Sequence, residues 1–368
     1  MDLHKDYGLR ELINARGVFT PLGVSRTPEP IIEAVAEALR HFFDMAELQD
    51  TTGRTIAEIT GSEWGTVTNC AAASITISVA AAMTGTDAEK IARLPDTTGL
   101  ANRVVIQAGH LVDYGQPIEQ AIRLAGAEVV VAGGPDRCTR QDLETALATE
   151  NVAALVVVDS RLIAGETVPP AQAVALAHAI GLPVILDGAA QDLRLDELIA
   201  TGADLIAVSA QKYLSGPTAG LVFGTRALVD AVNAQGKGIG RGMKAGKEAV
   251  FGALAALKLR QTLDLARWET VKLQEAETFA AHIAGLPGIT TELVPDPTKG
   301  PFCRVHATID PAAVGKPAGQ VISELAQGDR PIFVYAEPQR PGTIVLELME
   351  LTDEEREAIA VRLKEILA

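Results

Sequence analysis

Between about residues 51 and 230 the chain alternates short apolar runs with stretches of helical spacing, and this alternation constrains the fold more than any other feature. Short apolar runs separated by helical segments are typical of parallel strands joined by crossover helices. We therefore predict an α/β fold with a mostly parallel sheet covered by helices on both faces. The expected strands are TVTNC (66–70), RVVIQ (103–107), AEVVVA (127–132), AALVVVD (153–159), PVILD (183–187), DLIAVS (204–209) and AGLVFG (219–224).

The segments before and after this region have different patterns. A Gly- and Pro-rich arm leads into a helical pattern over residues 31–43, and a long helical pattern runs from about 249 to 282. The last helix is expected to begin at TDEE, a capping signature. The predicted parts are an N-terminal arm and helix (1–50), a large α/β domain (51–248), and a bridging helix with a small C-terminal α+β domain (249–368).

Composition excludes several classes of protein. A formal net charge of −15 repels the phosphate backbone that dominates nucleic-acid affinity, so we expect no nucleic-acid partner. The three cysteines are scattered without a CxxC pair, which argues against a disulfide framework or a metal site. The N-terminus is charged and no long apolar stretch occurs, so we expect no membrane partner and a cytoplasmic protein.

Asp187 and Lys212 follow two consecutive predicted strands. Strands joined by one crossover are often neighbours in a parallel sheet, so both side chains are expected at one sheet edge, where α/β proteins place their chemistry. Pyridoxal 5'-phosphate (PLP) needs a lysine amine to bind it and a carboxylate against its pyridine nitrogen. The alternative is that Asp187 caps a helix and Lys212 is a surface charge.

The helix that follows the first strand begins with small residues, Ala71, Ala72, Ala73 and Ser74. Small residues let the backbone N–H groups at a helix start approach an anion, and the helix dipole favours negative charge there. This helix start is a candidate cradle for the cofactor phosphate. The alternative is an Ala-rich helix packed closely on the sheet.

Five motifs in order carry a family resemblance. They are the small-residue helix, GHLVDYG (109–115), DGAA (187–190), SAQK (209–212) and GIGRGMKAGKE (238–248). The sequence resembles the fold-type I PLP enzymes of the selenocysteine-synthase-like group, and within it the D-glucosaminate-6-phosphate ammonia lyases. The resemblance implies a PLP-dependent transferase fold.

The resemblance also implies roles for individual residues. Lys212 corresponds to the lysine that holds PLP as a Schiff base, and Asp187 to the partner of the pyridine nitrogen. His110 is placed to stack on the cofactor ring, although a hydrogen-bonded loop histidine is the alternative. The expected phosphate contacts are Ala72, Ala73, Ser74 and Ser209.

Four cationic residues are candidates for binding the substrate. Arg241, Lys244 and Lys247 lie in one glycine-rich loop of an acidic protein, which suggests a site for a carboxylate or phosphate. A solvated loop is the alternative reading. Arg26, in the N-terminal arm, is a further candidate for the same pocket. The implied substrate is a small anionic amino compound.

The resemblance favours α,β-elimination from a hydroxy amino acid or aminosugar acid, giving a 2-oxo acid and ammonia. Racemisation, aldol cleavage, transamination or selenium transfer remain alternatives, as does a non-catalytic protein with the same fold. The C-terminal run around Glu347 and Glu350 departs from the Asp-Pro-Arg of relatives, which leaves the substrate open. A homodimer or higher homo-oligomer is also implied.

Overall fold

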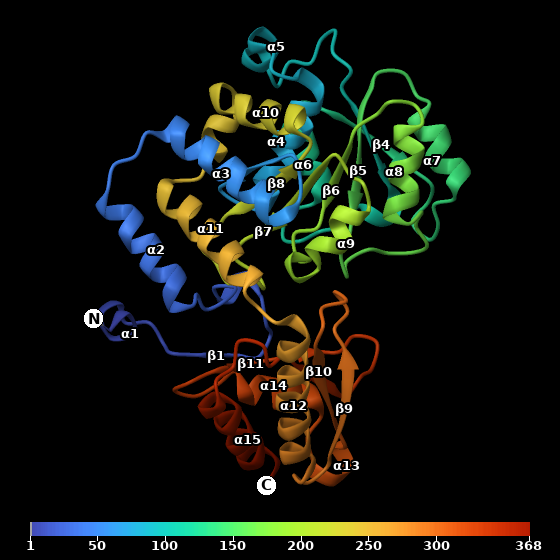
Figure 1. Cartoon of the computed structure of the whole chain (residues 1–368). Helices are drawn as coiled ribbons and strands as arrows, with labels where there is room; N and C mark the ends of the chain where they lie inside the picture. Colours follow the sequence, from blue (N-terminus) through green and yellow to red (C-terminus); the bar gives the residue numbers. More distant parts are fainter. Residues whose placement is uncertain (1) are drawn as a thin grey trace. The chain divides into compact units, whose positions relative to one another are not determined.

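A computed structural model describes residues 2–368 (Figure 1). The chain forms two compact units, a larger one over residues 27–262 and a smaller one that combines residues 2–26 with residues 263–368. The domain boundaries that the sequence predicted at residues 50 and 248 stay predictions. Among the described residues, no helix is long and apolar enough to cross a membrane.

The larger unit is built on a seven-stranded sheet with the order β2-β8-β7-β6-β5-β3-β4. Strands β3 to β7 pair in parallel, whereas β8 is antiparallel to both β7 and β2. The mostly parallel sheet is therefore confirmed. The strands are β2 (Trp64–Thr68), β3 (Arg103–Gln107), β4 (Glu128–Ala132), β5 (Val152–Val158), β6 (Val184–Asp187), β7 (Leu205–Ser209) and β8 (Gly220–Gly224).

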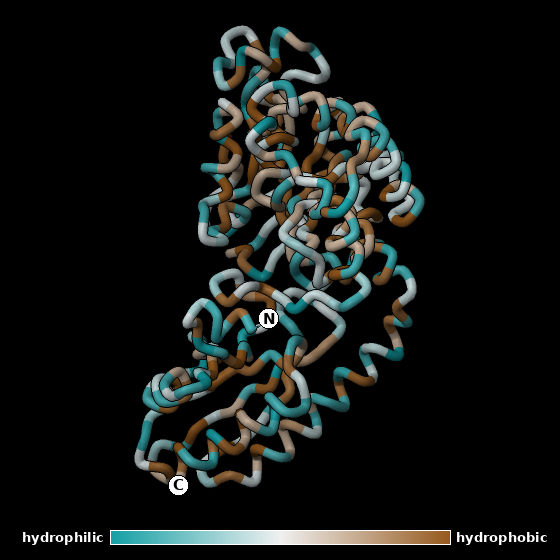
Figure 2. The backbone as a smooth tube through the Cα atoms, turned by 90° about the vertical axis from the view of Figure 1, so that its left-hand side faces the viewer, coloured by the Kyte–Doolittle hydropathy of each residue, from teal (hydrophilic) through white to brown (hydrophobic). Residues whose placement is uncertain are grey.

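Helices cover both faces of this sheet (Figure 1). Along β5, Leu155 and Val157 face one core while Val156 and Val158 face the other, so the strand reads as a continuous apolar run. The backbone coloured by hydropathy shows apolar segments running through the interior of this unit (Figure 2).

The helices fall into two sets by the core that they join. One core contains α4 (Ala71–Thr84), α6 (Ile118–Arg123) and α10 (Arg226–Ala234), with the short α5 (Ala88–Arg93) beside α4. The other contains α2 (Glu29–Arg40), α3 (Met45–Thr60), α7 (Arg140–Leu147), α8 (Pro170–His178), α9 (Leu195–Ala200) and α11 (Lys247–Gln261).

The N-terminus of α4 lies unusually close to strand β8. A Cβ atom at Gly220 would lie 2.4 Å from Ser74 Oγ and 2.5 Å from Thr68 Oγ1. Both distances are shorter than a van der Waals contact, so a larger residue here would push these side chains away. Glycine at this position therefore allows the helix start to sit against the sheet edge.

Two predicted helices differ from the structure. The helix predicted over 249–282 is two helices, α11 and α12 (Leu265–Ala284), because Asp264 caps α12 by accepting the N–H of Arg267 at 3.1 Å. The helix predicted over 31–43 ends at Arg40, and Phe42 beyond it is fully exposed.

The smaller unit has a four-stranded antiparallel sheet of order β12-β13-β10-β9, and its α+β character is confirmed. Helix α15 begins with the predicted capping box, in which the Thr352 hydroxyl accepts the Glu355 N–H at 3.2 Å and the Glu355 carboxylate accepts the Thr352 N–H at 3.0 Å. The sheet strands are β9 (Ile289–Pro295), β10 (Cys303–Ile309), β12 (Tyr335–Ala336) and β13 (Thr343–Leu346). The other elements are β1 (Ile13–Asn14), which pairs in parallel with β11 (Ile332–Phe333), α1 (Leu3–Tyr7), α13 (Pro311–Val314), α14 (Ala318–Leu325) and α15 (Asp353–Leu367).

Candidate active site

Asp187 and Lys212 stand at the carboxyl ends of neighbouring strands. Asp187 is the last residue of β6 and pairs in register with Ala207 of β7, while Lys212 lies in the turn that follows β7. The predicted adjacency of the two strands is confirmed. The Asp187 side chain is 5% exposed, and its Oδ1 accepts the Ala189 N–H at 3.0 Å.

The electrostatics of these two groups are shaped by burial. Burial raises the pKa of the Asp187 carboxyl, against the opposing effects of the Ala189 N–H and the Lys212 charge. Burial lowers the pKa of the Lys212 amine, against the carboxylates of Asp187 and Asp192. Arg161 adds to the lowering. A lowered pKa increases the share of the neutral, nucleophilic form of a lysine amine at any given pH.

The start of α4 lies after β2 in the same unit. The N–H groups of Ala71 and Ala72 have no partner within the helix, because the first turn of any α-helix lacks acceptors for them. Cys70 Sγ accepts the Ala73 N–H at 3.5 Å. The Ser74 hydroxyl is buried and hydrogen-bonded to the Thr68 hydroxyl at 2.8 Å and the Cys70 carbonyl at 3.2 Å. The Ser74 hydroxyl thus has protein partners at this helix start, and its contact with a phosphate stays a prediction.

His110 ends the 3-10 helix η2 (Ala108–His110) that follows β3, and only 1% of it is exposed. Its Nδ1 accepts the Val158 N–H at 3.2 Å, which leaves the proton of a neutral ring on Nε2. Burial lowers the pKa of His110 to about 4, so the ring is uncharged at neutral pH. His110 is thus a hydrogen-bonded histidine, as the alternative interpretation of the sequence expected, while its stacking on a cofactor stays a prediction.

The burial of His110 predicts an acid-sensitive contribution to folding. Its pKa falls from 6.5 to about 4 on folding, so the unfolded chain binds the proton more tightly and stability is lost as pH falls from 6.5 toward 4. Between pH 7 and pH 5 this amounts to about 2 kcal/mol. We therefore expect the free energy of unfolding of His110→Asn to fall less than that of the wild type between pH 7 and pH 5, as measured by urea unfolding at both pH values. Equal acid sensitivity of the two proteins would contradict the prediction.

Two residues near this site were missed from the sequence. Tyr114 lies in the segment after His110, and burial together with the charges of Asp187 and Cys70 raises the pKa of its hydroxyl. It therefore lies near both Asp187 and the α4 start, and its place in GHLVDYG was the available signal. Asp192 is fully buried five residues after Asp187, and its position in DGAAQD was the only sequence signal.

Ser209, the remaining predicted phosphate contact, is the last residue of β7 and is buried. Its N–H donates to the Ala189 carbonyl at 3.1 Å, which ties the end of β7 to the loop after Asp187. Ser209 thus lies at the same sheet edge as Asp187, three residues before Lys212.

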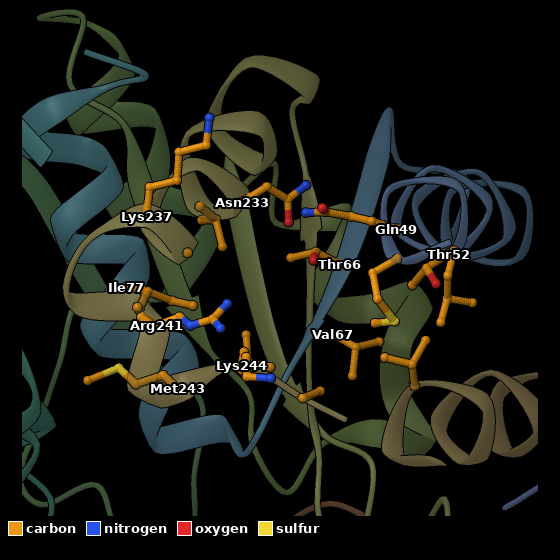
Figure 3. A pocket seen from close by; sticks show the side chains of 18 residues that line it. Gln49, Thr52, Thr66, Val67, Ile77, Asn233, Lys237, Arg241, Met243 and Lys244 are labelled. Atoms are coloured by element: carbon orange, nitrogen blue, oxygen red, sulfur yellow. The ribbon is translucent and has the colours of Figure 1, made fainter. Parts of the chain in front are cut away.

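Two of the predicted substrate cations line one cavity. Arg241, in the 3-10 helix η5 (Ile239–Met243), and Lys244 border a cavity of about 360 Å³ together with Thr66 of β2 and Gln49 of α3. In Figure 3 the ends of the Arg241 and Lys244 side chains point into this space. Lys237 lines the same cavity, which is therefore bordered by three cationic residues beside neutral hydrogen-bonding groups.

The other two predicted substrate cations have protein partners. Lys247, the first residue of α11, donates to the His41 carbonyl and lies 5.7 Å from the ring centre of Phe42. In the smaller unit, the Arg26 guanidinium makes two hydrogen bonds to the Glu355 carboxylate, at 2.5 and 2.7 Å. A substrate role for either residue stays a prediction, and Arg26 would have to leave Glu355 to fill it.

The C-terminal run around Glu347 and Glu350, which differs from the pattern expected of relatives, lies inside the smaller unit. Glu347 is buried, with 1% of its side chain exposed, and forms an ion pair with Arg304, whose Nη2 lies 2.8 Å from Glu347 Oε2. The Glu350 carboxylate accepts the N–H of Arg26 at 2.8 Å. Both carboxylates thus have cationic or N–H partners within this unit.

Comparison with known proteins matches residues 12–275 to the family model described as SelA: L-seryl-tRNA selenium transferase. The chain is 33% identical over 366 residues to D-glucosaminate-6-phosphate ammonia lyase of Salmonella typhimurium (strain 14028s / SGSC 2262), covering 99% of this chain and 98% of that protein. It is 34% identical over 367 residues to 5'-C-glycyluridine monooxygenase-decarboxylase of Streptomyces sp, covering 99% and 92%.

Among solved structures, the one titled "Structure of D-Glucosaminate-6-phosphate Ammonia-lyase" superposes with a TM-score of 0.91 at 33% identity, over 100% of this chain and 98% of that one. The predicted resemblance and fold are therefore confirmed. Because the family model spans residues 12–275, including both Asp187 and Lys212, the chain belongs to the L-seryl-tRNA selenium transferase (SelA) family.

Proposed function

We propose that the protein is a PLP-dependent ammonia lyase, a carbon–nitrogen lyase. It would catalyse α,β-elimination of water from a hydroxy amino acid or aminosugar acid, and hydrolysis of the product would give a 2-oxo acid and ammonia. The observation that carries the proposal is the pairing of the buried Asp187 with the partly buried Lys212 at the ends of adjacent strands. Full-length similarity to an ammonia lyase supports it.

The residues present fit PLP. When bound, PLP supplies an electron-withdrawing ring that stabilises negative charge at the substrate Cα. Asp187, whose Oδ1 accepts the Ala189 N–H, would hold a proton on the ring nitrogen. The N–H groups of Ala71 and Ala72, which have no acceptor within α4, would bind the phosphate at the positive end of the helix dipole. The Lys212 amine would bind the cofactor and, once released, move the Cα proton.

The substrate anion is proposed to bind Arg241 and Lys244 in the cavity of Figure 3. A carboxylate or a phosphate oxygen fits two cations, and the adjacent Thr66 and Gln49 side chains can hydrogen-bond to hydroxyl groups. This chemistry suits an anionic, hydroxylated amino compound.

Removing these cations tests the anion site. We expect Arg241→Met and Lys244→Met each to lower kcat/KM by about 10- to 100-fold, because a hydrogen bond to a charged group is worth about 1.5–3 kcal/mol. The loss should appear mainly in KM, since the anion is remote from the reacting carbon. Lys258→Met, an exposed change on α11, serves as the control. Unchanged KM values in both cavity variants would remove the assignment.

The similarity to a monooxygenase-decarboxylase supports a second candidate. Both reactions are compatible with a cofactor that stabilises charge at Cα, but they differ in whether oxygen is consumed and carbon dioxide released. Racemisation, aldol cleavage and transamination share the same requirement for Asp187 and Lys212. Selenium transfer to tRNA is disfavoured by the net charge of −15.

One experiment separates these reactions. The purified protein loaded with PLP is incubated with D- and L-hydroxy amino acids and aminosugar acids, each free and phosphorylated, while ammonia, 2-oxo acid, oxygen and carbon dioxide are measured. We expect equal amounts of ammonia and 2-oxo acid with no oxygen consumed. Racemisation without ammonia, or oxygen uptake with carbon dioxide release, would replace the lyase by the corresponding alternative.

We also propose a cytoplasmic homodimer or higher homo-oligomer. Support comes from apolar side chains on and after α2 that are exposed in the single chain, with Leu39 59% exposed and Phe43 39% exposed. Exposed apolar side chains that gather in one region mark protein interfaces. Light scattering of the purified protein should give a mass of at least two chains. A monomer at micromolar concentration would contradict this proposal.

A further inference from the structure

Asp192 is a buried carboxylate that the proposed reaction does not use. It opens the 3-10 helix η3 (Asp192–Arg194), between β6 and α9, and none of its surface is exposed. Burying a charged carboxylate costs folding free energy unless partners compensate its charge, so the partners of Asp192 determine what it does in the core.

One carboxylate oxygen of Asp192 anchors the turn that carries Lys212. Asp192 Oδ2 accepts the N–H of Leu214, two residues after Lys212, at 2.5 Å. The same turn is closed by the Ser215 N–H donating to the Lys212 carbonyl at 3.0 Å, and Ser215 adopts a left-handed backbone with φ of 53°. Such a backbone is disfavoured for a serine, so outside contacts are needed to hold it.

The other oxygen of Asp192 has no hydrogen-bond partner within residues 2–368, although it is buried. Two cations act on this carboxylate, Lys212 from the turn and Arg260 from α11. Arg260 itself donates to the Leu193 carbonyl at 3.1 Å, which places it against η3. Lys212 in turn is acted on by Asp187, Asp192 and Arg161. Asp192 is therefore one of two acids that influence the Lys212 amine.

Burial raises the pKa of Asp192 to about 7, against the Leu214 N–H and the two cations. The carboxyl can therefore gain or lose its charge in the pH range in which an enzyme works. Its ionised form favours the protonated amine of Lys212, and its neutral form does not.

From this geometry we propose that Asp192 is a positioning residue for Lys212. It fixes the Lys212 turn through the Leu214 N–H and, by its charge, sets how readily the lysine amine holds a proton. The role of Lys212 in binding PLP rests on the proposed function, whereas the coupling between Asp192 and Lys212 does not. A purely structural Asp192 would anchor the turn equally well as an uncharged amide.

The test uses Asp192→Asn, because asparagine keeps an oxygen that accepts the Leu214 N–H but carries no charge. The full-length protein without cofactor is acylated with acetic anhydride at a series of pH values, and the rate at Lys212 is followed by peptide mass spectrometry. We expect the midpoint of reactivity to fall by about one pH unit, since an opposite charge near an amine raises its pKa. Asp196→Asn, an exposed change of the same charge on α9, should leave it in place.

A second variant keeps the proposal testable if Asp192→Asn does not fold. Arg260→Gln removes the other cation near Asp192, which raises the pKa of the carboxyl and so reduces its charge beside Lys212. The Lys212 midpoint should then also fall. An unmoved Lys212 midpoint in every folded variant of Asp192 and Arg260 would overturn the proposal.

The pH titration of visible absorbance in the PLP-loaded protein gives an independent readout and should move in the same direction. If the wild type takes up no PLP but the acylation midpoint still shifts, the coupling holds and the proposed function fails. If PLP binds through Lys212 and neither midpoint moves, the proposed function stands and the positioning role fails.

Discussion

Replacing Lys212 by alanine is expected to abolish both the visible absorbance that PLP acquires on the protein and the cofactor adduct that borohydride fixes. Lys212 is partly buried, which lowers the pKa of its amine, and the methyl side chain of alanine cannot form the covalent link. Turnover should fall by at least about 10³-fold, because the same amine is proposed to carry the Cα proton. Absorbance, mass spectrometry of the reduced protein and ammonia release measure the three effects.

The matched control is Lys90→Ala, which removes a half-exposed lysine that pairs only weakly with Asp87 at 3.9 Å on helix α5. It should keep the absorbance, the adduct and the activity. Persistence of the borohydride adduct in Lys212→Ala, found on a different peptide, would show that another lysine holds the cofactor. Far-UV circular dichroism must show that both variants are folded.

Replacing Asp187 by asparagine is expected to lower kcat by about 10²–10³-fold, the usual cost of removing one preorganised electrostatic contact at a reacting group. Asparagine can still accept the Ala189 N–H, so the loop after β6 should keep its place. It carries no negative charge, however, and cannot hold a proton on the ring nitrogen. Cofactor affinity should also weaken, which dialysis and absorbance titration measure.

Asp187→Glu restores the charge on a longer side chain and should recover part of the rate, whereas Asp196→Asn should have no effect. Full turnover in a folded Asp187→Asn protein would exclude a contact with the ring nitrogen. A loss confined to cofactor affinity, with normal kcat at saturating PLP, would assign Asp187 to binding alone.

The contributions of His110 and Asp192 to folding stability change with pH in opposite directions. His110 destabilises the fold as pH falls from 6.5 to about 4, because its folded pKa is lowered. Asp192 has a folded pKa raised to about 7, so its contribution is complete below its unfolded value near 3.8 and is lost as pH rises toward 7. Unfolding measurements on His110→Asn and Asp192→Asn can therefore separate the two contributions.

The sequence by itself predicted the strands of the large sheet and the pairing of β6, which ends at Asp187, with β7, which precedes Lys212. Apolar runs and helical spacing are local patterns, and one crossover between consecutive strands leaves few possible topologies. The TDEE signature predicted the start of α15 for the same reason, because a capping box is complete within four residues.

Only the tertiary structure decided the contacts between segments far apart in the chain. It turned β8 antiparallel to both of its neighbours, bonded the Ser74 hydroxyl to Thr68, and paired Arg26 with Glu355 across 329 residues. It also set Asp192 against the Lys212 turn, 22 residues along the chain. These outcomes depend on which surfaces pack together and which polar groups find partners once water is excluded, and no local spacing encodes that.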